Sequence, residues 1–313
     1  MIIDSHSHLQ DKKLCESVGL NLPPNMLNVE GLVEEQAASG IDLSVISGPR
    51  LMDIAVDQQN KDPVEIAQRY HDFVTNLVSN HSSTFAGLGV GYPFADDAML
   101  REMERAVRDL GLKGFVISPT CAGEFIDSPK ALPFFELCQE LDAVVFVHNR
   151  DSCLACEHMQ DYRLTELVGR PNEMGLLAAR LIFSGLMEKL PNLKILLGRL
   201  GGSITLYAGR IQQGWEMRHK RKDGPAWGPD NLTNGFMESL KKIHVDTQTY
   251  HAPAITCAVE TLGIERVLFG TDYPPVPRDR ALSIEDVRLT NLPSDQIDLI
   301  LSGNAVRLFG LSG

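Results

Sequence analysis

The sequence has 313 residues, of which 43% are hydrophobic and 22% are charged, a composition typical of an ordinary globular protein. Its formal net charge of −12 and its pI of about 5.2 argue against a general binder of nucleic acid or of an anionic membrane. A small anionic substrate is not excluded, because a local cluster of Arg side chains can oppose the overall charge.

Nothing in the sequence suggests export or membrane insertion. The N-terminus, MIIDSHSHL, lacks the basic region and the long apolar run of a secretory signal. No window reaches the roughly 20 apolar residues that a membrane-spanning helix needs. The single CxxC pair, Cys153 and Cys156, favours a structural or incidental role over a zinc or redox site. We therefore expect a cytoplasmic protein with reduced cysteines.

Short apolar runs alternate with amphipathic helical patterns along the chain. The runs are too short for helices and are rich in Val, Ile, Leu and Phe, as buried parallel strands are. In chain order they cover Ile2–Asp4, Leu43–Ile46, Ala86–Val90, Gly114–Ser118, Val144–His148, Lys194–Gly198, Ile243–Asp246 and Val267–Gly270. Helical patterns between them include Leu100–Leu110, Pro129–Leu141 and Gly175–Leu190. Eight such alternations predict an α/β protein, a single (β/α)₈ TIM-barrel domain over residues 1–313.

Two stretches interrupt this alternation. Gln10–Glu30 is irregular and contains Pro23–Pro24, so we expect it to form a short lid or edge insertion after the first strand. Gly224–Asn234, with the sequence GPAWGPDNLTN, is typical of a second long loop.

Polar side chains follow the predicted strands where a barrel enzyme has its active site, at their carboxyl ends. His6 and His8 end the first strand, and alternation along an extended chain puts both on one side. His148 ends the fifth strand, and Asp272 follows the eighth. Three imidazoles and one carboxylate at one barrel mouth predict a site for a divalent metal, Zn²⁺ or a similar ion such as Mn²⁺.

Each of these residues also has an ordinary structural interpretation. A lone HxH can lie at the surface, His148 can be a hydrogen-bonded core residue, and Asp272 can cap a turn. Their joint position at the ends of three strands favours the metal site. The fourth strand ends in Ser118–Pro119–Thr120 and offers no Lys that could be carbamylated as a bridging ligand, so we expect one metal ion.

The sequence resembles the amidohydrolase-related branch of the amidohydrolase superfamily, in particular the group with α-amino-β-carboxymuconate-ε-semialdehyde decarboxylase and γ-resorcylate decarboxylase. The resemblance extends over nearly the whole chain after the first loop. It rests on the motifs DSHSHL, HSSTFAGLGV, ERAVRDLGLKGFVI, VFVH, YRLTELVGRPNE, LPNLKILLGRLGG, AGRIQQGWEMR, VLFGTDYP and SGNAVRLFGL. The resemblance implies a distorted barrel, one metal ion held by His6, His8, His148 and Asp272, and a homodimer.

One departure from the family concerns catalysis. Decarboxylases of this family have a His after the sixth strand, where Arg199 stands in the motif GRLGG. Arg remains charged and cannot act as a general base, but it can clamp a carboxylate or stabilise an oxyanion. The acid–base role could pass to His251 in DTQTYH, the chemistry could differ, or activity could be lost.

The family also binds its substrate carboxylate with Arg residues after the sixth strand, partly across the dimer interface. The resemblance carries this role to Arg210 and Arg218, each of which could instead make ordinary surface ion pairs. The family's substrate-binding Arg of the first insertion has no evident counterpart, and Arg163 and Glu166 stand where an aromatic pair is expected. We therefore expect a different substrate.

Three functions remain open from the sequence. The first is a metal-dependent decarboxylase of a small unsaturated or aromatic carboxylate, in which Asp272 ligates the metal and carries a proton while Arg199, Arg210 or Arg218 holds the anionic group. The second is a metal-dependent hydrolase of an amide, lactone or C–C bond, in which metal-bound water attacks. The third is a degenerate barrel without catalysis, against which the complete ligand set argues.

Overall fold

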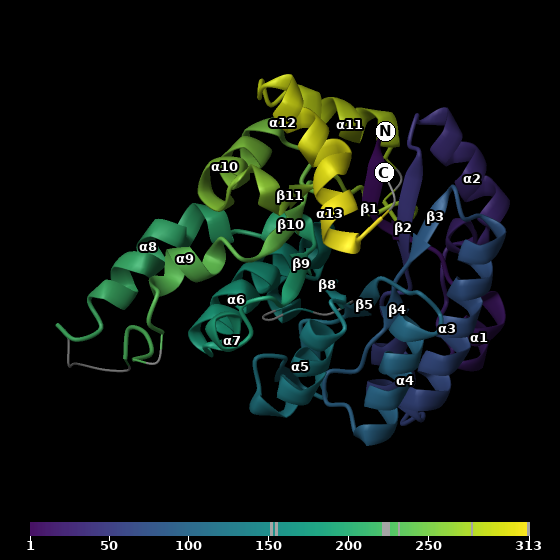
Figure 1. Ribbon diagram of the computed structural model, residues 1–313, viewed down its shortest axis with the longest axis horizontal. Helices are drawn as coiled ribbons and strands as arrows, with labels where there is room; N and C mark the ends of the chain where they lie inside the picture. Colours follow the sequence, from purple (N-terminus) through teal and green to yellow (C-terminus); the bar gives the residue numbers. More distant parts are fainter. Residues whose placement is uncertain (151–152, 154–155, 221–225, 231, 277, 312–313) are drawn as a thin grey trace.

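The computed structural model describes residues 1–150, 153, 156–220, 226–230, 232–276 and 278–311, with strands at the centre and helices around them (Figure 1). The strands are β1 Ile3–His8, β2 Leu43–Ser47, β3 Phe85–Gly87, β4 Gly89–Val90, β5 Gly114–Ile117, β6 Thr120–Cys121, β7 Glu124–Phe125, β8 Val144–Val147, β9 Lys194–Leu197, β10 His244–Asp246 and β11 Val267–Leu268. The helices are α1 Lys12–Ser17, α2 Val29–Ala38, α3 Pro63–Asn80, α4 Asp97–Arg108, α5 Leu132–Glu140, α6 Arg170–Phe183, α7 Leu186–Lys189, α8 Ile204–Glu216, α9 Gly235–Leu240, α10 Ala252–Leu262, α11 Arg280–Arg288, α12 Ser294–Asp298 and α13 Asn304–Phe309.

The central strands form a distorted parallel barrel. One sheet has the order β1-β2-β3 and the other the order β4-β5-β8-β9-β10-β11, with parallel pairing throughout. Only Leu88 separates β3 from β4, so these two short strands together occupy the place of one strand in the barrel. On the other side, Ser5 N donates to Phe269 O at 2.9 Å and Asp272 N donates to His6 O at 2.8 Å. These bonds join the start of the chain to its last strand, as the predicted barrel requires.

The helices agree with the sequence patterns except in one place. The continuous pattern over Gly175–Leu190 is broken, because α6 ends at Phe183 and α7 begins at Leu186. Gly185 between them has φ +81°, a left-handed conformation that glycine adopts at low cost. Within the described ranges, no helix has the length and apolar character needed to span a membrane.

The insertion after β1 is more ordered than its sequence indicates. It contains α1, whose first turn is capped by Asp11, and the 3₁₀ turn Pro24–Leu27. Its two ends are tied to the barrel, since Gln10 donates to the carbonyl of Pro49 at 2.8 Å and Asn25 donates to that of Pro274 at 3.1 Å. The expected loop over Gly224–Asn234 lies partly outside the described residues.

A buried ion pair joins β1 to the segment that follows β11. The Arg280 side chain is fully buried, and its Nη2 lies 2.7 Å from Oδ2 of Asp4 while its Nη1 lies 2.9 Å from Glu35. Asp4 Oδ1 also accepts from the backbone N of Thr271 at 3.1 Å. Because Asp272 comes next in the chain, this pair fixes the end of the last strand. Removing one partner of such a pair typically costs about 3–5 kcal/mol.

Candidate metal centre

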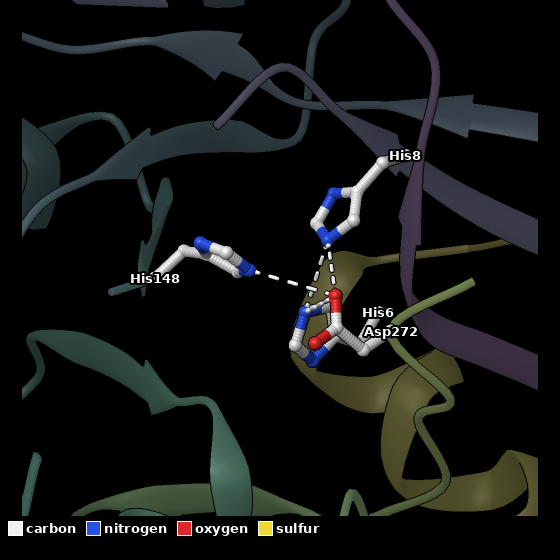
Figure 2. A group of neighbouring side chains, drawn as sticks. All are labelled: His6, His8, His148 and Asp272. Carbon is white, nitrogen blue, oxygen red and sulfur yellow. Dashed lines mark hydrogen bonds and ion pairs between the residues drawn. The ribbon is translucent and has the colours of Figure 1, made fainter. Parts of the chain in front are cut away.

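Three imidazoles and one carboxylate meet at the carboxyl ends of β1, β8 and β11 (Figure 2). Alternation in β1 brings His6 and His8 to the same side, with their Nε2 atoms 3.1 Å apart. Oδ1 of Asp272 lies 3.0 Å from Nε2 of His8, 3.4 Å from Nε2 of His6 and 3.6 Å from Nε2 of His148. The four predicted ligands therefore converge, with all four donor atoms within 4.8 Å of one another.

The opposite ring nitrogen of each His has an oxygen partner. Nδ1 of His6 lies 2.5 Å from Oδ2 of Asp246, and Nδ1 of His148 lies 2.9 Å from the carbonyl O of Asn149. Nδ1 of His8 lies 3.0 Å from Oγ of Ser47, whose own hydroxyl donates to a backbone carbonyl. All three rings can thus carry their proton on Nδ1, which leaves the Nε2 lone pairs facing one another.

These donors fit a divalent metal ion. Tetrahedral Zn²⁺ with bonds near 2.1 Å separates its ligand atoms by roughly 3.4 Å, close to the distances from Oδ1 of Asp272. Nε2 of His148 is buried and has no hydrogen-bond partner among the described residues. A buried nitrogen acceptor without a partner is costly, and metal ligation would satisfy it. A site of three nitrogens and one oxygen suits Zn²⁺ and Mn²⁺ alike.

The charges of the cluster are strongly coupled. Burial by itself lowers the pKa of His6, but the carboxylates of Asp272 and Asp246 raise it to about 9. Burial lowers the pKa of His148 to about 3, so this ring is neutral, as a metal ligand must be. Burial alone would raise the pKa of Asp272, yet His6 and Arg199 together hold it well below its usual range. Asp272 is thus balanced by protonated His6 and by Arg199, and a metal ion bound at this site would displace the Nε2 proton of His6.

Arg199, which follows the sixth predicted strand, points toward Asp272. Its Nη2 lies 3.1 Å from Oδ2 of Asp272, its Nε lies 3.1 Å from Oδ1 of Asn149, and its Nη1 lies 3.3 Å from Oε1 of Gln248. Only 12% of its side chain is exposed. The carboxylate that balances the charge of Arg199 therefore belongs to Asp272, which is also a predicted metal ligand.

The turn that presents Arg199 is unusual in its backbone. Arg199 and Leu200 both have left-handed conformations, with φ of +58° and +56°. The amide of Leu200 donates to Oδ1 of Asp246 at 3.1 Å, which helps to hold this turn. Gly202 packs so closely against α6 that a Cβ atom there would lie 1.8 Å from the carbonyl O of Pro171. The glycines of GRLGG therefore allow the turn to pack on a neighbouring helix.

A pocket of about 410 Å³ opens beside Arg199. Its wall combines polar residues such as Gln248, Tyr250 and Asn172 with the apolar side chains of Leu200 and Leu206. Arg199 thus stands between this pocket and Asp272. Glu166 also lies in the wall, where its charge is balanced by Arg163 and Arg170, so Arg199 is the cation available to a small organic anion in this pocket.

The other predicted site residues lie away from the four ligands. His251 is exposed and precedes α10, and none of its described contacts reaches the cluster. Arg210 is exposed on α8. Arg218 lies 4.0 Å from the ring centre of Trp215 and 3.4 Å from Asp230, so it is engaged at the end of α8. In Figure 1, α8 projects away from the strands.

Several residues of the site were not assigned by sequence reasoning. Asp246 was not assigned a role beside the histidines, although its carboxylate contacts Nδ1 of His6. Asn149 and Gln248 each follow a strand end by a residue or two, which was the available signal. A cavity of about 20 Å³, enough for roughly one water molecule, has His148, Arg50 and Tyr92 in its wall.

The comparisons with known proteins agree with this geometry. A family model described as amidohydrolase matches residues 3–311. The chain belongs to the amidohydrolase family. Among curated relatives, 2-amino-3-carboxymuconate-6-semialdehyde decarboxylase of Dictyostelium discoideum is 30% identical over 289 residues, which cover 89% of this chain and 76% of that protein. The resemblance inferred from the motifs is thereby confirmed.

Solved structures of two decarboxylases share the fold. The 5-carboxyvanillate decarboxylase of Sphingomonas paucimobilis superposes with a TM-score of 0.86 at 23% identity, covering 100% of this chain and 99% of that one. A dihydroxybenzoic acid decarboxylase of Polaromonas sp. JS666, solved with bound manganese and 2-nitroresorcinol, gives a TM-score of 0.82 at 23% identity, with 99% and 97% covered. These similarities confirm the predicted barrel.

Proposed function

We propose that this member of the amidohydrolase family is a metal-dependent decarboxylase of a small aromatic or unsaturated carboxylate. The observation that supports it most directly is the convergence of His6, His8, His148 and Asp272 next to Arg199, which also lines a pocket. The relative from Dictyostelium discoideum carries a decarboxylase name, and its match covers most of both chains. The proposed substrate class rests on the size of the pocket beside Arg199 and on the decarboxylase names of this relative and of the two solved structures.

The proposed cofactor is one divalent ion, with Zn²⁺ as first choice and Mn²⁺ as the alternative. When bound, such an ion would act as a Lewis acid on an oxygen atom of the substrate. Purified protein should contain about one equivalent of metal per chain, measured by elemental analysis before and after reconstitution. The double variant His6→Ala/His8→Ala should lose it. His158→Ala, a change at an exposed histidine, is the matched control and should keep it. Full metal retention in the double variant would overturn the assignment.

The residues of the chain divide the remaining work. Decarboxylation replaces a C–CO₂⁻ bond by a C–H bond, so the site must hold a carboxylate and deliver a proton to carbon. Arg199 has five N–H donors and uses three in the described contacts, so two remain for a substrate anion. We assign to Asp272 both metal ligation through Oδ1 and the handling of the proton. No step is assigned to His251, Arg210 or Arg218 within one chain.

The test is CO₂ release by the metal-reconstituted protein over a panel of aromatic and muconate-type acids. Asp272→Asn should lower the rate at least about 100-fold while circular dichroism stays unchanged, because a ligand and a proton carrier are lost together. Asp109→Asn, at an exposed position at the end of α4, is the control for the loss of one carboxylate. Hydrolysis of amides or lactones without CO₂ release from any acid would favour the hydrolase instead. Rates within about threefold of the parent in Asp272→Asn would contradict its chemical role.

We further propose a homodimer built partly on the described part of residues 204–227. Large apolar side chains are exposed on and around α6 and α8, namely Tyr162, Leu167, Leu176, Leu206, Tyr207 and Trp227. A groove of about 640 Å³ runs between these helices and has Arg210 in its wall. A single chain gains nothing from exposing so many apolar groups together, whereas a second copy would bury them. We also propose that the protein is located in the cytoplasm.

A further inference from the structure

A second pocket lies at the opposite end of the barrel from the metal ligands. Its volume is about 590 Å³, and its wall includes Lys194 and His244, the first residues of β9 and β10. Three more cations line it: Lys242, Arg266 and Arg307. Strands of a parallel barrel start at one end and finish at the other, so this pocket is separate from the site that begins at their carboxyl ends. A concentration of four cations is unexpected in a chain with a net charge of −12.

Two of the four cations have carboxylate partners at the rim. Lys194 lies 2.6 Å from Asp142, and Arg307 lies 3.6 Å from Glu265. Both carboxylates are largely exposed, with 77% and 65% of their side chains accessible. Each of these pairs is therefore well screened by water and contributes little stability.

The other two cations lack such a partner in the described part of the chain. Nζ of Lys242 donates to the backbone carbonyl of Met187 at 3.0 Å. Nη1 of Arg266 lies 2.9 Å from Nε2 of His244. No carboxylate oxygen of the described residues lies within ion-pair distance of either cation. The pocket thus has an excess of two positive charges.

His244 does not neutralise this excess. Burial lowers its pKa to about 3, and the positive charge of Arg266 acts in the same direction, so the ring is neutral. Its Nδ1 faces the carbonyl O of Ile195 at 3.3 Å and must carry the proton, which leaves Nε2 to accept from Arg266. A neutral acceptor of this kind fixes the direction of a guanidinium without using up its charge. Arg266 is itself half-buried, and burial lowers its pKa; the exposed carboxylate of Glu265 opposes this shift and the charge of Arg307 adds to it, so the positive charge of Arg266 is only partly balanced.

We propose that this pocket binds a small oxyanion with two negative charges, held by Arg266 and Lys242. The planar guanidinium suits bidentate contact with phosphate or carboxylate oxygens, and the ammonium of Lys242 adds a second point charge. A phosphate group and a dicarboxylate share this chemistry. The site does not depend on the proposed decarboxylase function, because it uses none of the residues of the metal centre.

The experiment titrates the metal-loaded, full-length protein with inorganic phosphate and, separately, with succinate, at constant ionic strength in a calorimeter. Saturable binding of at least one of them at millimolar concentration is expected. Arg266→Met and Lys242→Met should each weaken it by at least about tenfold, the loss of one charge-assisted contact. Lys241→Met removes an exposed neighbour that pairs with Glu238, and its dissociation constant should equal that of the parent.

Tighter binding of phosphate would indicate a ligand with a phosphate group, and tighter binding of succinate would indicate a dicarboxylate. Binding must persist in the His6→Ala/His8→Ala variant, since an anion held at the metal centre would be lost there. Absence of saturable binding by both anions overturns the proposal. Equal weakening in Lys241→Met, or unchanged binding in Lys242→Met, overturns it as well. Lys242 is only partly buried and makes one hydrogen bond, so this variant remains informative if Arg266→Met does not fold.

Discussion

Nη2 of Arg199 lies 3.1 Å from Oδ2 of Asp272, the carboxylate whose other oxygen faces the three histidines. The same guanidinium reaches Asn149 and Gln248, so three of its N–H groups are engaged and two are left. This arrangement joins the pocket beside Arg199 to a proposed metal ligand through one permanently charged side chain. It also accommodates Arg at a position where the resemblance led us to expect His, while the four proposed ligands remain together.

Arg199→Lys tests whether this side chain binds substrate. Lys keeps the charge but loses the planar fork, so we expect KM for the native acid to rise about 10–100-fold, as for a lost charge-assisted pair worth about 1.5–3 kcal/mol. Metal content should stay at about one equivalent, because no ligand is changed. Steady-state kinetics and elemental analysis measure both. Arg101→Lys, at an exposed position on α4, controls for the exchange itself.

Arg199→His separates a functional Arg from the loss of a family histidine. A functional Arg199 requires KM for the native substrate to rise in this variant too. If Arg199 is only the result of losing a catalytic His, restoring His should instead raise the rate of decarboxylation of the acids that the family's decarboxylases use. Unchanged kcat and KM for every acid tested would leave Arg199 without a role in the reaction.

Asp246→Asn should weaken metal binding about 10–100-fold, the usual effect of removing a partner that orients a ligating His. The Asp246 carboxylate lies 2.5 Å from Nδ1 of His6, and Asn supplies neither the charge nor the same acceptor strength. Competition with a fluorescent chelator measures the dissociation constant. Asp109→Asn should leave it unchanged. A dissociation constant within about twofold of the parent would show that His6 does not need this carboxylate.

Glu102 provides a pH dependence that is independent of the metal centre. Burial alone would raise its pKa, but hydrogen bonds from His71 and Arg105 lower it from 4.5 to about 2. Folding lowers the pKa of this carboxyl. Its ionised form therefore stabilises the native state at pH values above its pKa in the unfolded chain, and this contribution is lost as the pH falls toward its pKa in the folded protein. The contribution should therefore be complete above about pH 5 and vanish near pH 2, with an upper size of about 3 kcal/mol.

Urea unfolding of the parent and of Glu102→Gln at several pH values measures this linkage. The difference in unfolding free energy between the two proteins should shrink steadily from pH 5 toward pH 2.5. Glu104→Gln, on the same helix but more exposed, should show a much smaller change. A difference that stays constant over this range would mean that Glu102 does not titrate in this way.

Leu206→Glu should convert the proposed dimer into a monomer. The Leu206 side chain is 73% exposed in the single chain, so a charge there costs the monomer little. In an apolar interface the same charge would be buried without a partner. Light scattering at micromolar concentration checks the mass of both proteins, with Leu289→Glu, at another exposed leucine, as control. A parent protein that is already monomeric would contradict the dimer.

Much of this protein follows from the sequence by itself. Short β-rich runs between helical patterns define a barrel, and its strands finish at one end, so His6, His8, His148 and Asp272 had to come near one another. The alternation of an extended chain is enough to place His6 beside His8. The single-metal expectation also rests on sequence, because no Lys follows the fourth strand.

The tertiary structure decided which groups surround those ligands. No local pattern pairs Asp246 with His6 or Arg199 with Asp272, since these contacts join residues 240 and 73 positions apart and depend on how strands twist around the barrel. The break of the predicted helix at Gly185 likewise follows from a left-handed backbone that the periodic pattern of apolar residues does not register. Periodicity reports which face of an element is buried, whereas the partners of a buried charge depend on the packing of the whole barrel.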